Sequence, residues 1–311
     1  MTIQHPASEF DVIVVGGSYA GLSAATQLAR ARRRILVIDA GQRRNRYAHH
    51  SHGFLGHDGR EAAAIAADGR AQLLKYPTVR WIEGSAAQAV PHEVQQGSGF
   101  RVTLNDGRAF DARRLVLATG VVDELPPVPG LAERWGSSAF HCPYCHGYEL
   151  DQGRIGVLAT GPLSMHQAMM LPDWGSVTLL LNGAFEPDAE QLASLATRGV
   201  TVERARVKAL TGRASVELED GRKLEMDGLF VMSRTHSGSP LAEQLGCAME
   251  EGAMGFFVRT DMIKATTVAG VYACGDAARM AGNVAMAAAD GTMAGVAAHQ
   301  SLIFGAVAAA A

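Results

Sequence analysis

A glycine-rich turn between two short apolar runs constrains the fold of this chain more than any other feature. The run "DVIVV", residues 11–15, is followed at once by "GGSYAG" and then by a segment in which Leu22, Ala25 and Leu28 recur at helical spacing. A second apolar run, "ILVID", ends at Asp39. The order of strand, glycine turn, helix and strand predicts a parallel βαβ unit.

This turn has the residues that a dinucleotide-binding site needs. Glycine lets a pyrophosphate approach the backbone N–H groups at a helix N-terminus, where the helix dipole favours negative charge. Gly16 and Gly21 match the G-x-G-x-x-G spacing, and the middle position is Ser18, a small residue that can donate to a phosphate. Asp39 follows about 20 residues on, where such folds place the acid that accepts the ribose hydroxyls. The glycine motif alone would be weak, but it does not stand alone.

A second strand, turn, helix and strand occupies the middle of the chain. It runs through "RIGVLATG", "PLSMHQAMML" and "SVTLLLNG", between residues 154 and 183. Upstream lie a hairpin around Asp106 and Gly107, a strand that ends at Gly120, and a proline-rich crossing, "ELPPVPG", that suits a domain linker. We therefore expect two Rossmann-like units in one chain.

Composition limits the partners of the protein. The chain has 311 residues, enough for two domains, and its 48% hydrophobic and 19% charged residues are typical of a compact protein. A net charge of -3 gives no general attraction to nucleic acid or to an anionic membrane. The N-terminus lacks the pattern of a secretory signal, and the alanine-rich C-terminal segment is too weakly apolar to span a bilayer. We expect a cytoplasmic protein that binds neither nucleic acid nor membrane.

The stretch "FHCPYCHGYEL", residues 140–150, places Cys142 and Cys145 two residues apart. In a reducing compartment such cysteines indicate catalysis, a metal site or core thiols rather than a structural disulfide. Zinc normally takes four ligands, and histidines directly beside the cysteines would strain to bind the same ion, so we expect no metal. Inert thiols stay open as an alternative, although the pattern favours a redox pair. Cys247 and Cys274 stand alone, and we expect both to be buried core thiols.

Four motifs in order resemble the low-molecular-weight thioredoxin reductase type of flavoprotein along almost the whole chain. They are "GGSYAGLSAA", "LATG" at residues 117–120, "CPYC" and "GVYACGD". The resemblance implies an α/β fold with two Rossmann-like, three-layer (ββα) nucleotide-binding domains, the second inserted into the first. It implies an FAD-binding domain from residues 1–122 and 243–311 and a central NAD(P)-binding-like domain, residues 123–242, that carries the cysteine pair. A homodimer is the usual assembly.

The same resemblance implies where FAD would bind. Asp276 would accept a hydrogen bond from the ribityl chain, and the helix that begins near Val284 would direct its positive end at the flavin ring. The implied cofactor residues come from the first glycine turn, the end of the second strand, the "LATG" segment, the Gly-Asp turn and the start of the last helix: Gly16, Ser18, Tyr19, Ala20, Gly21, Asp39, Ala118, Thr119, Gly120, Gly275, Asp276, Val284 and Ala285.

By resemblance, Cys145 exchanges electrons with the flavin and Cys142 reacts with the external substrate. Ordinary thioredoxin reductases have an aspartate after the second cysteine, whereas this chain has His146. An imidazole takes a proton from a thiol near neutral pH more readily than a carboxylate does, so we expect His146 to be catalytic. A histidine that only hydrogen-bonds a loop is the alternative. We expect a second group, at positions 50, 52 and 57, to be loop or solvent histidines.

The second nucleotide motif lacks residues that NADPH binding needs. Its turn has Ala159, Gly161 and Ser164, so the first glycine is missing, and residues 182–184 after the next strand are Asn-Gly-Ala, with neither a cation nor an acid. Together with "CPYCHGYE", this loss is similar to the dithiol oxidases of the gliotoxin and holomycin type. That similarity implies that FAD takes two electrons from a small natural-product dithiol and passes them to oxygen, giving hydrogen peroxide.

Two alternatives stay open at this point. One is a thioredoxin reductase-like disulfide reductase that uses NAD(P)H or another electron donor such as ferredoxin. The other is a non-catalytic, flavin-binding redox sensor, which has no need of an intact "CPYC". Nucleotide binding separates the first alternative from the oxidase, and dithiol turnover in air separates both enzymes from the sensor.

Overall fold

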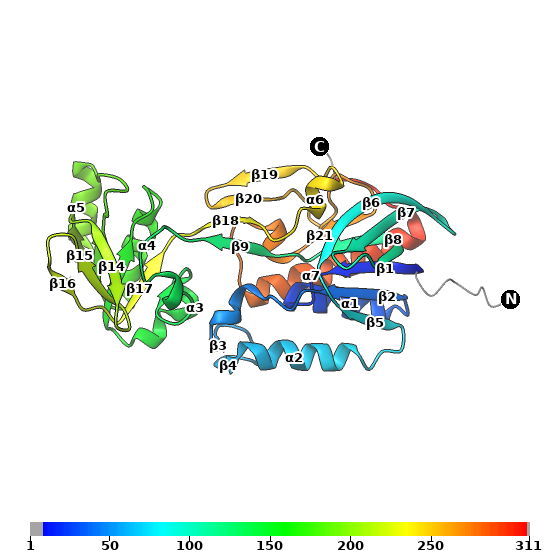
Figure 1. The fold of residues 1–311 in the computed structure, drawn as a ribbon, viewed down its shortest axis with the longest axis horizontal. Helices are drawn as coiled ribbons and strands as arrows, with labels where there is room; N and C mark the ends of the chain where they lie inside the picture. The colour runs from blue at the N-terminus through cyan, green and yellow to red at the C-terminus, as the bar shows by residue number, and fades with distance from the viewer. Residues whose placement is uncertain (1–8, 310–311) are drawn as a thin grey trace. The chain divides into compact units, whose positions relative to one another are not determined.

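The computed structural model describes residues 9–309, which form two compact units (Figure 1). As far as they are described, Met1–Arg44, Ala63–Val122 and Thr235–Ala311 make the first unit, and Asn45–Ala62 with Asp123–Arg234 make the second. Each unit contains parallel strands and helices, so the predicted α/β fold with two Rossmann-like domains is confirmed. The chain leaves the first unit in β9 (Val121–Glu124) and returns in β18 (Arg234–Ser237).

Two segments belong to units other than those expected from the sequence. Residues 235–242 join the first unit because Leu241 and Ala242, at the start of α6 (Leu241–Gln244), are buried in its hydrophobic core. Residues 45–62 join the second unit, where Tyr47 packs so tightly that a Cβ on Gly136 would lie 2.6 Å from the Tyr47 Cβ.

The first unit is built on a seven-stranded sheet in which β21 pairs with β8 beside the main path. β5, β2, β1, β8 and β21 are parallel, and β6, β7 and β8 form an antiparallel meander that contains the predicted hairpin at Asp106 and Gly107. In sheet order the main path is β5 (Val79–Glu83), β2 (Ile35–Asp39), β1 (Glu9–Val15), β8 (Ala109–Leu117), β7 (Gly97–Leu104) and β6 (Ala86–Val94).

Three of the parallel strands end at the same level. Val15 of β1 and Ala273 of β21 (Val271–Ala273) both pair with Leu117 of β8. Because the strands are parallel, the loops that follow them leave from one edge of the sheet. This register brings together the first glycine turn, the "LATG" segment and the Gly-Asp turn.

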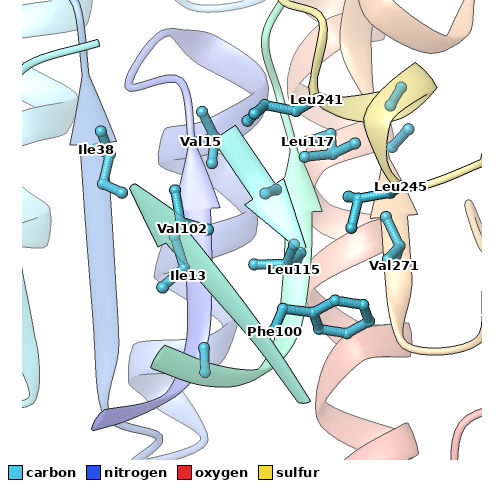
Figure 2. Close-up of a cluster of buried hydrophobic side chains, with 14 of the residues drawn as sticks. Ile13, Val15, Ile38, Phe100, Val102, Leu115, Leu117, Leu241, Leu245 and Val271 are labelled. Carbon is cyan, nitrogen blue, oxygen red and sulfur yellow. The ribbon is translucent and has the colours of Figure 1, made fainter. Parts of the chain in front are cut away.

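Alternating side chains bury both faces of this sheet. Ile13 and Val15 of β1 contribute to one hydrophobic cluster, whereas Val12 and Val14 contribute to another. Figure 2 shows the first cluster, in which the β1 side chains lie near Leu115 and Leu117 of β8, with further side chains from α6, β7 and β21. A β-branched run buried on both faces is typical of a central parallel strand.

Helix α1 (Tyr19–Arg30) packs closely along α7 (Val284–Phe304) through small residues. A Cβ on Gly291 would lie 2.0 Å from the Ala20 carbonyl oxygen, so glycine is required there. One turn later, a Cβ on Gly295 would lie 2.5 Å from the Ala24 oxygen, which shows that the helices run parallel. α7 has six more residues before this contact than α1, so its N-terminus extends about 9 Å further.

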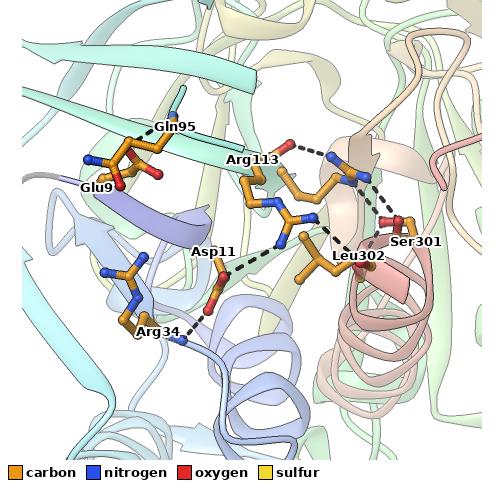
Figure 3. A network of polar contacts seen from close by, with 9 residues as sticks. Glu9, Asp11, Arg34, Gln95, Arg113, Ser301 and Leu302 are labelled. Atoms are coloured by element: carbon orange, nitrogen blue, oxygen red, sulfur yellow. Dashed lines mark hydrogen bonds and ion pairs between the residues drawn. The ribbon is translucent and has the colours of Figure 1, made fainter. Parts of the chain in front are cut away.

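A polar network fastens the C-terminal end of α7 to the sheet (Figure 3). Asp11 accepts a hydrogen bond from the Arg34 backbone N–H at 2.8 Å, and Arg113 lies 3.9 Å from the same carboxylate. Arg113 also donates to the Leu302 carbonyl at 3.5 Å, and Arg114 donates to the Ser301 hydroxyl at 2.9 Å. These contacts fix the position of α7 relative to β1 and β8. The remaining elements of this part of the chain are α2 (Ala62–Leu73), β19 (Met249–Gly252) and β20 (Gly255–Val258).

The second unit has a five-stranded parallel sheet with helices around it. The sheet order is β10 (Ala139–Phe140), β17 (Gly228–Val231), β11 (Arg154–Leu158), β12 (Ser176–Leu180) and β13 (Thr201–Glu203). The helices are α3 (Pro143–His146), α4 (Ser164–Met170) and α5 (Ala189–Thr197). An antiparallel sheet is formed by β14 (Val207–Thr211), β15 (Ser215–Leu218) and β16 (Lys223–Leu224), and a hairpin by β3 (His50–Ser51) and β4 (Arg60–Glu61).

Candidate active site

Cys142 and Cys145 form a disulfide with their Cα atoms 5.3 Å apart. Cys142 precedes the short helix α3 in an extended conformation, and Pro143 opens the helix, where its missing N–H costs nothing. The Cys145 N–H donates to the Cys142 carbonyl at 3.2 Å, so the turn itself holds the two sulfur atoms within bonding reach. Both cysteines are partly exposed, and a thiol can therefore reach the pair.

His146 lies directly after the pair, with its ring stacked on Phe140. The ring centroids are 4.3 Å apart and the planes differ by 14°. Both ring nitrogens are buried, and neither has a hydrogen-bond partner among residues 9–309. Burial, reinforced by the charge of His52, lowers the pKa of His146 to about 4, while the Cys142 carbonyl acts in the opposite direction. His146 is therefore neutral near pH 7.

Distant elements support the cystine segment. Gln167 of α4 is 2% exposed and donates through Nε2 to the His141 carbonyl at 2.8 Å. The Tyr144 ring meets Trp174 edge to face at 5.3 Å, and a Cβ on Gly147 would lie 2.8 Å from the same indole. Gln167 and Trp174 could not be found from the sequence, because nothing in the local pattern indicates a long-range contact with residues 140–150.

The structure also brings one histidine of the 50–57 group to this segment. His52 Nδ1 lies 3.4 Å from Glu149 Oε1 and 3.7 Å from Asp58 Oδ1. His57 instead contacts the Arg60 guanidinium at 2.9 Å, and His50 is exposed. The expectation of three loop histidines therefore overlooked His52, since an ion pair between positions 52 and 149 leaves no trace in local sequence.

The first glycine turn lies at the sheet edge where β1, β8 and β21 end. Gly16 has a φ of +105°, and a Cβ there would lie 2.1 Å from the Ala118 carbonyl oxygen. A Cβ on Gly21 would lie 1.8 Å from the Gly16 oxygen, so both glycines are required by the turn itself. Ser18 is the N-cap of α1, yet its side chain makes no capping hydrogen bond. The hydroxyl thus stays available to a ligand at the start of this helix.

The acidic residues at this edge are held by neighbours. Asp39 Oδ1 accepts the Gly17 N–H at 3.1 Å, which leaves Oδ2 for a ribose hydroxyl. Asp276 Oδ2 is 2.9 Å from Arg44 NH1, a partner that could not be identified from the sequence.

Helix α7 is capped by Asn283, whose side chain accepts the Met286 N–H at 2.9 Å. An asparagine before an apolar helix is a recognisable N-cap signal, so this residue could have been found from the sequence.

Most of the expected cofactor residues meet at this one edge, and they fit a dinucleotide such as FAD. A Cβ on Gly275 would lie 2.9 Å from the Ala20 Cβ and 3.7 Å from the Ala287 Cβ, so the Gly-Asp turn contacts the first turns of α1 and α7. Two helix N-termini, a carboxylate on the second strand and glycine-bounded turns are the groups that bind a pyrophosphate and a ribose. Val284 and Ala285 form the first turn of α7, and Thr119 and Gly120 follow β8.

A family model described as pyridine nucleotide-disulphide oxidoreductase matches residues 10–295. The chain belongs to this family. The thioredoxin reductase tcpT of Claviceps purpurea is 31% identical over 306 residues, covering 94% of each chain. A solved oxidoreductase from Agrobacterium tumefaciens is 55% identical with a TM-score of 0.91, covering 95% of this chain and 99% of its own. The solved structure of HlmI is 36% identical with a TM-score of 0.90, covering 97% of this chain and 95% of its own.

These similarities confirm the predicted resemblance to thioredoxin reductase-like flavoproteins. As a pyridine nucleotide-disulphide oxidoreductase, the chain is an enzyme of redox chemistry with a cystine segment in its second unit. Among residues 9–309, no group of three or more His, Cys, Asp or Glu side chains is arranged to hold a metal ion. The same part of the chain has no helix that is both long enough and apolar enough to cross a membrane.

In this oxidoreductase, the nucleotide site of the second unit has one feature that opposes NADPH binding and one that favours it. The buried Ser164 hydroxyl accepts the Thr160 N–H at 3.0 Å, so one N–H of the turn is used within the protein. A cation does lie after β12, because a Cβ on Gly183 would be 3.0 Å from Arg206 NH2. The prediction of no cation considered only residues 182–184, and Arg206 comes from the segment before β14.

The other two cysteines are buried, as predicted. Cys247 is 6% exposed and Cys274 is 0% exposed. Burial raises the pKa of the Cys274 thiol to about 12, so it is not a nucleophile at neutral pH.

Proposed function

We propose that this oxidoreductase is an FAD-dependent dithiol oxidase that forms a disulfide in a small natural-product dithiol. The observation that carries the proposal is the partly exposed Cys142–Cys145 disulfide, followed directly in the sequence by His146, whose imidazole is neutral near pH 7. A reductase delivers electrons outward from this pair, whereas an oxidase must take protons from incoming thiols. A base that is free near pH 7 suits the second task.

The first step consumes the protein disulfide. His146 accepts the proton of one substrate thiol, and the thiolate attacks the Cys142 sulfur. The Cys142–Cys145 bond breaks, which gives a mixed disulfide on Cys142 and a thiolate on Cys145.

The second step releases the product. His146 passes the first proton to the Cys145 thiolate and then accepts the proton of the other substrate thiol. That thiolate attacks the substrate sulfur bound to Cys142, and Cys142 leaves as a thiolate. The substrate has lost two electrons and two protons, and the cysteine pair has gained two electrons. FAD, when bound, would supply the acceptor for these two electrons and pass them to oxygen, giving hydrogen peroxide. The residues that would hold it are those at the sheet edge described above, with Gly16, Asp39 and Gly275 among them.

The proposal includes a cytoplasmic homodimer. Helix α7 exposes several large apolar side chains within an arc of about 100° on one face. They are Met286, Met293, Val296, Ile303 and Phe304. Such a stripe on a helix that packs beside the cofactor turn supports pairing with a second copy of the chain.

A second candidate is a disulfide reductase fed by NAD(P)H. Arg206 favours it, since its guanidinium lies close to Gly183 after β12, where a cation suits the 2′-phosphate of NADPH. The Ser164 hydrogen bond to the Thr160 N–H opposes it. A redox sensor without turnover would not need the accessible disulfide.

The test is oxygen consumption by the FAD-reconstituted protein with a simple small dithiol in air. We expect loss of thiols and formation of one peroxide per disulfide, and we expect Cys145→Ser to abolish both. Cys247→Ser is the matched control, because its thiol is buried in the core of the first unit, and it should retain activity. Full turnover in Cys145→Ser, or thiol loss without peroxide, would overturn the proposal.

A further inference from the structure

The hairpin of β3 and β4 has an internally hydrogen-bonded loop that carries a half-buried histidine, His52. Its loop contains Gly53, Gly56 and Gly59, all with positive φ, the conformation that glycine adopts without strain. Two hydrogen bonds close the loop. The Gly53 N–H donates to Asp58 Oδ1 at 2.8 Å, and the Gly59 N–H donates to the Ser51 carbonyl at 3.0 Å. A loop bonded to itself in this way holds its side chains in fixed directions.

His52 extends from this loop to the segment that carries the cysteines. Its side chain is 21% exposed, and Nδ1 lies 3.4 Å from Glu149 Oε1. Glu149 belongs to the short helical turn η3 (Tyr148–Leu150). That turn is bonded back to the cystine helix, because the Gly147 N–H donates to the Pro143 carbonyl at 2.7 Å and the Leu150 N–H to Gly147 at 3.2 Å. A displacement of Glu149 is therefore transmitted to Cys145 and His146.

We propose that His52 is a positioning residue for the Cys142–Cys145 pair, because its contact with Glu149 fastens the β3–β4 hairpin to the segment that carries both cysteines and His146. The part of this inference that concerns turnover rests on the proposed function. The contact itself does not.

The arrangement has an electrostatic consequence. The titratable groups that face His52 are Asp58 from its own loop, Glu149 and His146 from the cystine segment, and His50, whose ring centroid is 6.4 Å away. A positive charge on His52 disfavours a second positive charge on His146 and lowers its pKa, after burial as the larger cause. The charge of His52 therefore keeps His146 neutral down to a lower pH than burial alone would.

The test compares His52→Gln with His50→Gln by NMR titration of the His146 ring, assigned with His146→Asn. His50 is the matched control because it lies on the same hairpin, is exposed and is not within ion-pair distance of Glu149. We expect the pKa of His146 to shift upward in His52→Gln and to stay at the wild-type value in His50→Gln. An unchanged pKa in His52→Gln, or equal shifts in both variants, would overturn the proposal.

Glu149→Gln tests the contact itself and serves if His52→Gln does not fold. Loss of the ion pair frees the hairpin, so we expect an upward shift of the same sign. The double variant His52→Gln/Glu149→Gln should shift no further than His52→Gln alone, because both changes break one contact. Additive shifts would show that the two residues act independently and would contradict the proposal.

A turnover arm separates this inference from the proposed function. If the protein oxidises dithiols, the acid limb of its kcat/KM profile should move to higher pH in His52→Gln, in parallel with the NMR shift. An NMR shift without any dithiol turnover in the wild type would refute the oxidase and leave the positioning role intact. The remaining outcome is that the wild type turns over dithiols while the acid limb of kcat/KM stays at the same pH in His52→Gln, despite an NMR shift. That result would refute the role of His52 in the reaction.

Discussion

His146 lies parallel to Phe140, with the ring centroids 4.3 Å apart. The stack fixes the plane of the imidazole next to Cys145 and covers one of its faces with an apolar ring. Burial removes the hydration of the imidazolium, which lowers the pKa of His146, so His146 binds a proton only at low pH. A residue that would ordinarily titrate near pH 6.5 is thus neutral across the physiological range.

The first prediction concerns stability at low pH. The pKa of His146 is lowered from 6.5 to about 4 in the folded state, so the unfolded chain binds more protons between these pH values. Stability should fall as the pH falls through this window, by up to about 3 kcal/mol from this residue. Urea denaturation at pH 7 and pH 4.5 should show a smaller loss in His146→Asn than in the wild type. The exposed His166→Asn is the control, and an equal loss in all three proteins would contradict the prediction.

The second prediction concerns the roles of the two cysteines. Reduced Cys145→Ser should capture a small linear disulfide as a mixed disulfide on Cys142, because the Cys145 thiol that would displace it is missing. Intact-mass spectrometry should detect one adduct in Cys145→Ser and little in Cys142→Ser. A stronger adduct in Cys142→Ser would reverse the assignment of the attacking sulfur.

The third prediction concerns the contact between α1 and α7. A Cβ on Gly291 would lie 2.0 Å from the Ala20 carbonyl oxygen, so Gly291→Ala must separate the two helices. We expect a loss of about 1–3 kcal/mol in the free energy of unfolding and weaker FAD binding, because both helix N-termini move. Chemical denaturation and flavin fluorescence measure these effects. Gln300→Ala, at an exposed polar position of α7, should change neither, and a Gly291→Ala protein as stable as wild type would show that the helices pack differently.

The fourth prediction separates the oxidase from the reductase. If Arg206 is only a remnant of a nucleotide site, Arg206→Ala should leave the kcat and KM for a dithiol unchanged. Any slow flavin reduction by NADPH should fall in this variant, while reduction by NADH should not, since only NADPH carries the 2′-phosphate. Arg204→Ala, which breaks a surface pair with Glu186, is the control. A large loss of dithiol turnover in Arg206→Ala alone would not fit this account.

The features that could be predicted from the sequence are those set by short-range patterns. The run of residues 11–15, the glycines at 16 and 21 and the carboxylate at Asp39 lie within one βαβ unit, so spacing alone places them. The cystine followed by His146 is likewise local. These features fixed the fold class and the principal reacting groups.

What could not be predicted depends on contacts between distant segments. Gln167 and His52 reach the cystine segment from α4 and from the β3–β4 hairpin. Arg206 reaches Gly183, after β12, from the segment before β14. Asp276 was expected to face a ribityl chain, yet it is also paired with Arg44, 232 residues away in sequence. Burial of His146 is a further tertiary property, because it arises from Phe140 and the surrounding fold rather than from its immediate neighbours.

The most direct test of the account is the visible absorbance of the flavin-loaded protein, mixed without oxygen with a simple dithiol or with NADPH or NADH. The account predicts that the dithiol bleaches the flavin and that air restores the colour with release of hydrogen peroxide, whereas both nucleotides act slowly or not at all. Rapid bleaching by NADPH or NADH, with no bleaching by the dithiol, would contradict it and identify a reductase.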